Sequence, residues 1–154
     1  MLSRPCTYAI RALTFLAMQP PGKRTGAREV SDHEGIPSSF LSKVLLQLRR
    51  GRLLRSYKGI GGGYELALPP DKISLLMVVC CIDGAPFNDC ILGDHECLAE
   101  SECPLHQSWA PVRDKLNDYL ERNTLAELVR NRHERRAGSP DPASPILIKP
   151  VMEQ

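Results

Sequence analysis

The sequence predicts a mainly α-helical fold that carries one small β-hairpin and continues into a long helix. Apolar residues recur at helical spacing along most of the chain, whereas the alternation typical of a strand is confined to residues 52–70. The 154 residues, 42% of them hydrophobic, suffice for about one domain with an appendage. We therefore expect a helical domain with the hairpin at 1–72, further helices at 73–132 and a disordered tail at 133–154.

Three helices are expected before the hairpin. The first covers residues 3–19, and a second, over about 26–34, ends at Gly35, which suits a left-handed cap residue. Pro37 is well placed to open the third helix, which runs to about Gly51. The apolar face of this third helix is Phe40, Leu41, Val44, Leu45 and Leu48.

The second and third helices, joined by a turn that contains glycine, form a helix-turn-helix pattern. Small hydroxyls at the start of the third helix suit entry into the major groove of DNA, and cations near its end suit phosphates. An ordinary amphipathic helix pair is the alternative on this segment alone. The polar face consists of Ser38, Ser39, Ser42, Lys43, Gln47, Arg49 and Arg50.

The hairpin favours the DNA-binding interpretation, because a helix-turn-helix followed directly by a β-hairpin is the winged-helix arrangement. Tyr64, Leu66 and Leu68 alternate with smaller or polar residues, and Lys58 supplies charge next to the glycines. A nucleotide-binding loop is the competing interpretation. Its G-x-G-x-x-G fingerprint fails, because the last glycine would have to stand at Tyr64.

The second half of the chain predicts a buried helix at 73–84, a long helix at 104–121 that starts at Pro104, and a short helix at 124–132. Cys80 and Cys81 fall in the first of these and are expected to be core thiols. Apolar residues of the long helix follow the spacing of a coiled-coil seam, which favours a homodimer. They are Leu105, Trp109, Val112, Leu116, Tyr119 and Leu120.

Charge is divided unevenly along the chain, although the net charge is only +2. Residues 1–72 carry 12 Lys or Arg against 5 Asp or Glu, which suggests a polyanionic partner such as DNA. Residues 73–103 carry 6 acids and no Lys or Arg, and this stretch contains five of the six cysteines, which suggests a cation or an iron centre. A solvated face is the alternative for either charge run.

The compartment follows from what the sequence lacks. No apolar run approaches the roughly 20 residues that span a bilayer. Arg11 interrupts the apolar N-terminal stretch and no small-residue cleavage site follows, so a signal peptide is rejected. We expect a cytoplasmic protein without a membrane partner. In a reducing cytosol its cysteines are ligands, redox sensors or buried thiols rather than disulfides.

Several motifs in this order resemble the Rrf-type winged-helix transcription regulators of bacteria, which include the iron–sulfur regulators IscR and NsrR. They are YAIRAL (8–13), GIPSSFLSKVLLQLRRGRLL (35–54), KGIGGGYELA (58–67), the three-cysteine segment and TLAELV (124–129). The resemblance covers roughly residues 1–130 and implies no enzymatic activity. It implies a homodimer, usually a repressor, that binds a double-stranded DNA operator under the control of an iron–sulfur cluster.

The resemblance also assigns site residues. It implies that Cys90, Cys97 and Cys103 hold the cluster, with His106 as the histidine ligand. Three thiolates and one imidazole suit a [2Fe–2S] cluster better than a [4Fe–4S] cluster. In the family that the chain resembles, DNA contacts lie on the recognition helix, which is the third helix here, and on the wing. The polar face of that helix includes Ser38, Ser39, Ser42, Lys43 and Arg50, and the wing residue is Lys58.

Two departures from the family leave the fourth ligand and the cluster type open. The first cysteine gap holds six residues where the best-known members have five, and position 8, an acidic ligand in some members, is Tyr8. Cys6 lies nearby and could substitute. Other interpretations of the segment are a Cys₃His zinc site, a thiol switch without metal, and a small electron carrier. Zinc is disfavoured because no C-x₂₋₄-C pair is present, and an electron carrier because no partner-cofactor motif is present.

Overall fold

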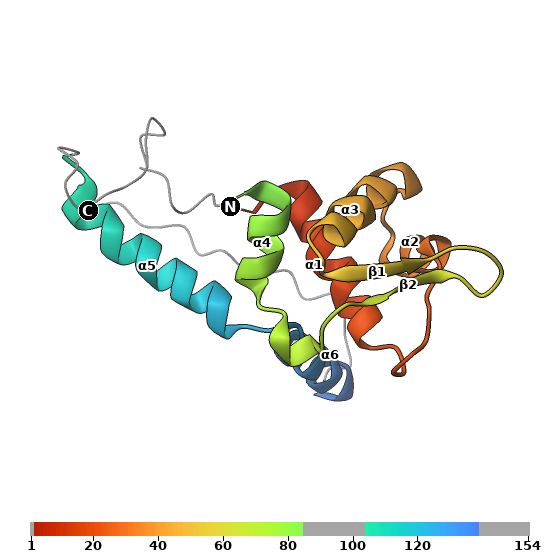
Figure 1. Cartoon of the computed structure of the whole chain (residues 1–154). Coiled ribbons are helices and arrows are strands. Elements are labelled where there is room, and N and C mark those ends of the chain that lie inside the picture. Colours follow the sequence, from red (N-terminus) through yellow and green to blue (C-terminus); the bar gives the residue numbers. More distant parts are fainter. Residues whose placement is uncertain (1, 85–103, 139–154) are drawn as a thin grey trace.

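The protein folds into six α-helices, a short 3₁₀ helix and one antiparallel hairpin over the residues that the structure, a computed structural model, describes, namely 2–84 and 104–138. Figure 1 shows the hairpin at one end and α5 at the other, with α1 between them. The elements in chain order are α1 (Arg4–Ala17), α2 (Ala27–Glu34), α3 (Ser38–Arg50), β1 (Leu54–Tyr57), β2 (Gly63–Leu66), η1 (Pro70–Lys72), α4 (Leu75–Asp83), α5 (His106–Arg122) and α6 (Leu125–Gly138).

Local sequence signals explain where several helices begin. The hydroxyl of Ser3 accepts a hydrogen bond from the Cys6 backbone at 3.1 Å, and Ser74 does the same for Met77 at 3.2 Å. Before α6, the Thr124 backbone donates to the Glu127 carboxylate at 3.2 Å, which is half of a capping box. These caps satisfy N–H groups that have no partner within the helix.

The turn between α2 and α3 confirms the expected role of Gly35. This residue caps α2 with φ of 61° and ψ of 36°, a left-handed conformation that glycine adopts without a steric penalty. The backbone N–H of Ile36 then donates to the Ser31 carbonyl at 3.1 Å. The predicted helix-turn-helix and the hairpin after it are both present, so the predicted winged-helix arrangement is confirmed.

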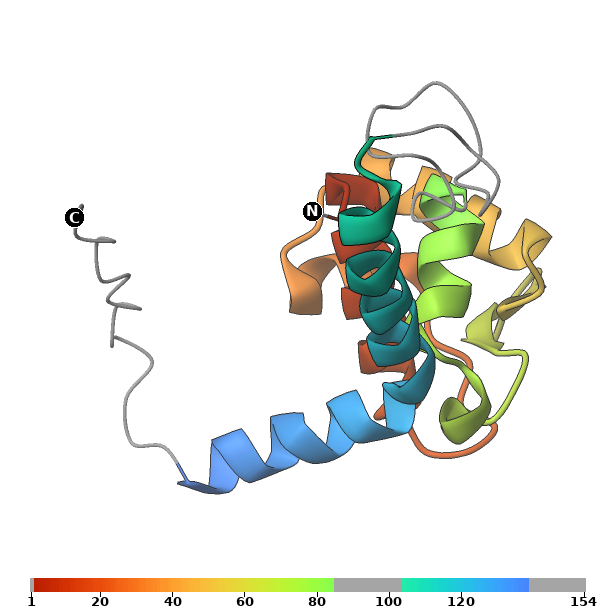
Figure 2. The same ribbon diagram turned by 90° about the vertical axis from the view of Figure 1, so that its left-hand side faces the viewer.

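One apolar core joins α1, α2, α3, the hairpin, α4 and α6. A smaller cluster, made by Cys6, Leu75, Val79 and Leu120, attaches α5 to α1 and α4. Figure 2 shows α5 running alongside α4. Burial of this apolar surface is the main term that stabilises the fold. The large core is built from Ala9, Ala12, Leu13, Phe15, Leu16, Val30, Ile36, Leu41, Val44, Leu45, Leu48, Leu53, Leu54, Ile73, Val78 and Leu125.

Three expectations about single elements are wrong. Phe40 is expected on the buried face of α3, but it is 53% exposed, and its ring makes an edge-to-face contact with the Tyr8 ring, with centroids 6.4 Å apart. The final helix continues to Gly138, beyond its expected end at residue 132. The long helix starts at His106 rather than at Pro104.

Two backbone hydrogen bonds join the start of α4 to the start of α6. The Leu75 N–H donates to the Asn123 carbonyl at 2.8 Å, and the Leu125 N–H donates to the Ile73 carbonyl at 3.0 Å. Ser74 and Thr124 pair between them as an isolated antiparallel bridge. We call this pair of bonds the α4–α6 junction.

Candidate DNA-binding surface and cysteine segment

The polar face of α3 is open to solvent along its whole length. All five predicted DNA-contacting side chains of this helix are exposed: Ser38, Ser39, Ser42, Lys43 and Arg50. The Ser42 hydroxyl donates to the Ser38 carbonyl at 2.8 Å within the helix, and its oxygen can still accept a hydrogen bond. The buried face of α3 points the other way, and the exposed side is polar apart from Phe40 and Leu46, which are 53% and 41% exposed.

The hairpin is held against the loop before α2 by a close backbone approach. Thr25 and Tyr64 pair as an antiparallel bridge, with N···O distances of 3.0 and 2.8 Å. Gly63 has φ of 143°, and a Cβ atom there would lie 2.7 Å from the Thr25 carbonyl oxygen. Glycine at position 63 therefore allows the backbone of the loop before α2 to pair with the hairpin.

Sequence reasoning missed Arg24 and Tyr57, which lie at the base of the hairpin loop. The Arg24 guanidinium stacks over the Tyr57 ring at 3.9 Å from its centroid. The Tyr57 hydroxyl donates to the Glu65 carboxylate at 2.6 Å, and this bond, with desolvation and the Glu65 charge, raises the pKa of Tyr57 against the opposing charges of Arg55 and Arg24. No periodic signal marks the pair, because the two side chains meet only through the Thr25 bridge.

The basic side chains of this side of the molecule are available to an anion. Lys43, Arg50 and Lys58 are exposed, and none of them forms an ion pair with another residue within 2–84 or 104–138. Lys58 directly follows β1 and lies in the loop that connects the two strands of the hairpin. Unpaired cations beside an exposed helix are what contact with a phosphate backbone requires.

The predicted cluster ligands Cys90, Cys97 and Cys103 lie outside the described residues. His106 is the first residue of α5 and is half-buried. Figure 2 shows that α5, which starts at His106, begins at the end of the molecule where α4 stops. Among the described residues, no group of three or more His, Cys, Asp or Glu side chains is arranged to hold a metal.

The other three cysteines differ from the expectation in part. Cys6 is fully buried, and burial, together with the negative charges of Asp83 and Cys81, raises its pKa to about 12. Formation of a thiolate is therefore unfavourable at Cys6, which makes it a poor substitute ligand. Cys80 is exposed, so the expectation of a core thiol is wrong there, whereas Cys81 is half-buried and packs against the core. Cys81 lies against Gly51, and its thiol donates to the Gln47 carbonyl at 3.5 Å.

The predicted apolar seam of α5 is only partly covered. Leu105, Val112 and Tyr119, spaced seven residues apart, are 40%, 54% and 60% exposed. Leu120 is buried against α1 and α4. The indole N–H of Trp109 is buried without a hydrogen-bond partner among the described residues. One face of α5 thus packs on its own chain while an apolar stripe stays uncovered.

Comparison with known proteins identifies relatives of the chain along nearly its whole described length. The family model Rrf2, described as an iron-dependent transcriptional regulator, matches residues 2–131. The HTH-type transcriptional regulator IscR of Pectobacterium atrosepticum is 30% identical over 125 residues, which cover 81% of this chain and 76% of that protein.

Two solved structures share the fold. The global cysteine regulator CymR of B. subtilis superposes with a TM-score of 0.72 at 23% identity, covering 85% of this chain and 97% of that one. IscR of T. potens also gives 0.72, at 20% identity, covering 92% of this chain and 93% of that one. Within the described residues, no helix has the length and apolar character needed to cross a membrane.

Proposed function

The chain belongs to the Rrf2 family of transcriptional regulators, and from this premise we propose that it is a homodimeric repressor whose operator binding is controlled by an iron–sulfur cluster. Its relatives are regulators and not enzymes. The proposal has three parts, which are the DNA contacts, the dimer and the cluster. The unpaired cations and hydroxyls of α3 and the hairpin carry the first part, and the other two depend on α5 and on the segment before it.

The recognition surface combines two kinds of contact. Ser38, Ser39, Ser42 and Lys43 lie on the first half of α3 and are the side chains proposed to meet base edges. Arg50 at the end of α3 and Lys58 in the hairpin loop are proposed to bind phosphates, which fixes the register without reading the sequence. Replacing a residue that meets base edges should therefore change the sequence preference of binding, whereas replacing one that binds phosphate should not.

Homodimer formation is supported by the uncovered stripe of α5. Leu105, Val112 and Tyr119 repeat every seven residues, which is the spacing of a coiled-coil seam. Two copies joined along this stripe would carry two recognition helices. DNA half-sites one helical turn apart, about 34–36 Å, then require the two winged-helix domains to be held at one fixed separation.

The cluster is proposed to be held by Cys90, Cys97, Cys103 and His106. Soft thiolates and an imidazole form a donor set that suits an iron–sulfur cluster, [2Fe–2S] in preference to [4Fe–4S]. When bound, such a cluster supplies a centre that responds to iron and to oxidants. His106 would bind through a neutral ring nitrogen, the form in which imidazole acts as a metal ligand. Because His106 starts α5, fixing its imidazole fixes the start of the helix that carries the seam.

Anaerobic purification tests the cluster assignment. We expect coloured protein that contains iron and acid-labile sulfide, and colourless dimers from Cys90→Ala, Cys97→Ala and Cys103→Ala. Cys80→Ala is the matched control, because Cys80 is an exposed thiol outside the proposed ligand set, and it should keep its colour and iron. Colourless wild-type protein that contains zinc, prepared strictly without oxygen, would contradict the cluster.

A thiol-based regulator without a cluster is the second candidate. It is favoured by the likeness to CymR, the global cysteine regulator of B. subtilis, and by the exposed thiol of Cys80. This function predicts anaerobic protein without iron whose DNA affinity changes reversibly with thiol oxidation. Iron content and oxidation response, measured on one preparation, therefore separate the two candidates.

A further inference from the structure

Glu34 is a buried carboxylate in an unfavourable position. It is the last residue of α2, directly before the left-handed Gly35, and its side chain is 3% exposed. Burial penalises its charge, and the negative end of the α2 dipole penalises it again. A charge that is unfavourable for two independent reasons persists only where its partners compensate for both.

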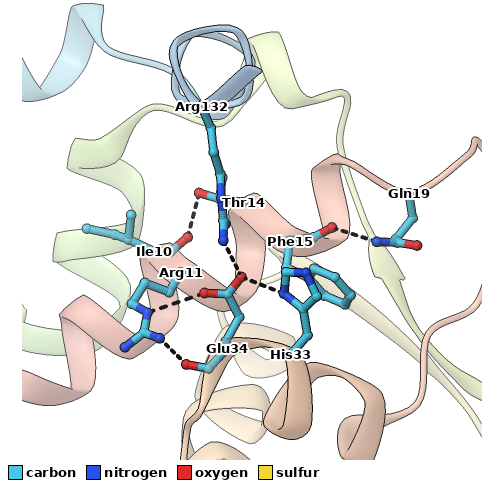
Figure 3. Close-up of polar contacts among 8 residues, drawn as sticks. All are labelled: Ile10, Arg11, Thr14, Phe15, Gln19, His33, Glu34 and Arg132. Carbon is cyan, nitrogen blue, oxygen red and sulfur yellow. Dashed lines mark hydrogen bonds and ion pairs between the residues drawn. The ribbon is translucent and has the colours of Figure 1, made fainter. Parts of the chain in front are cut away.

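Those partners come from three separate elements (Figure 3). Arg11 of α1 donates from Nε to the carboxylate at 3.3 Å, and its Nη2 also hydrogen-bonds the Glu34 backbone carbonyl. Arg132 of α6 donates from Nη2 to Glu34 Oε1 at 2.9 Å, although 98 residues separate the two. His33, stacked on Phe15 at 4.1 Å, lies with Nδ1 3.0 Å from the same oxygen.

The turn that follows Glu34 is also held tightly. The Ser31 hydroxyl donates to the Ile36 carbonyl at 2.7 Å, and the Ile36 N–H donates back to the Ser31 carbonyl at 3.1 Å. α3 begins only four residues after Glu34, at Ser38. The placement of the Glu34 end of α2 therefore determines the placement of the first turn of α3.

Arg132 connects the turn between α2 and α3 to α6. α6 follows α5 directly, and the α4–α6 junction pins its start. We propose that Glu34 and Arg132 are positioning residues, through which the placement of α6 sets the placement of α3 and so the DNA affinity. This inference rests on the proposed DNA binding and names a contact by which a change at α5 reaches the recognition helix.

The test compares two arginines of the same helix. Arg132→Met removes the charge that reaches Glu34 and keeps an apolar stem. Arg130→Met is the matched control, because Arg130 is 65% exposed and its one ion pair within residues 2–84 and 104–138 is with Glu127 of the same helix, at 3.6 Å. The probe is a pool of duplexes selected by the wild-type protein from a random-sequence library. Affinity is measured below the melting transition, where each variant keeps the wild-type circular dichroism spectrum.

We expect Arg132→Met to weaken binding about five- to tenfold, with Arg130→Met within about twofold of wild type. The salt slope should stay unchanged, because Arg132 is not proposed to contact phosphate. Arg132→Lys should recover part of the loss, and the losses of Glu34→Gln and Arg132→Met should not add in the double variant.

Three results would overturn the link. They are a lower melting temperature with unchanged affinity, additive losses in the double variant, and a reduced salt slope in Arg132→Met. The first would make the pair purely stabilising, and the last would make Arg132 a DNA contact. If the wild-type protein selects no duplex, the proposed DNA binding fails, and the link fails with it.

Discussion

Replacing Gly63 with alanine should detach the hairpin from the loop before α2. The new Cβ would lie 2.7 Å from the carbonyl oxygen, 2.8 Å from the carbonyl carbon and 3.0 Å from the nitrogen of Thr25. Because all three atoms belong to the backbone, the clash cannot be relieved by a side-chain rotation. The Thr25–Tyr64 bridge, with its two hydrogen bonds, must open or shift.

The magnitude of this effect can be worked out from the geometry. Losing two neutral hydrogen bonds costs about 1 kcal/mol each, and holding alanine at φ of 143° adds about 1–3 kcal/mol. The sum is about 3–5 kcal/mol of unfolding free energy, which corresponds to a melting temperature about 10 °C lower. Circular dichroism during heating measures it.

Gly59→Ala provides the control, since Gly59 also has positive φ, 84°, but nothing lies within 4 Å of its added Cβ. It should lose only the conformational part, about 1–2 kcal/mol. The excess loss in Gly63→Ala then reports the contact with Thr25. If the two variants melt at the same temperature, the close approach of the two backbones does not limit the stability of the hairpin.

Three further predictions concern charge and assembly. Lys58→Ala should weaken binding to all sequences alike and reduce the slope of log affinity against log salt by about one, as should Arg50→Ala; an unchanged slope in a fluorescence titration would remove Lys58 from the phosphate contacts. Val112→Glu should convert the proposed dimer to monomer in analytical ultracentrifugation, because Val112 is the most central of the exposed seam residues; a dimer that persists would place the interface elsewhere. For Glu34, burial alone would raise the pKa, but hydrogen bonds and charge from Arg132, with hydrogen bonds from His33 and Arg11, lower it below 4.5. Its ionised form thus contributes stability that is present above pH 4.5 and lost as the pH falls through the folded-state pKa, so urea unfolding of Glu34→Gln should depend less on pH in that acidic range than unfolding of wild type.

The helix-turn-helix and the hairpin were predictable because their signals are local. Gly35 marks the turn, and the alternation around Tyr64 marks a strand, whatever the rest of the chain does. Phe40 was misplaced because it stands about 100° around the helix from Leu41, at the edge of the apolar face. Whether such an edge position is covered depends on which helix packs there, and the contact with Tyr8 of α1 leaves Phe40 53% exposed.

The contacts that sequence reasoning missed are long-range. Arg132 and Glu34 are 98 residues apart, and nothing near either one marks it as half of a pair. Cys80 and Cys81 lie in an apolar run that gave no sign of which side α1 would cover. The ligand assignment of Cys90, Cys97, Cys103 and His106 came from family resemblance and stays a prediction.

The α4–α6 junction has a consequence for how such a regulator can diversify. The chain leaves the winged-helix domain at Ile73 and returns to it at Leu125. Two neighbouring backbone hydrogen bonds hold the ends of the intervening stretch side by side. Closing a flexible loop of twice the length costs only about 0.6 kcal/mol more. Insertions or deletions between α4 and α5 can therefore change that stretch without changing the register of the winged-helix domain.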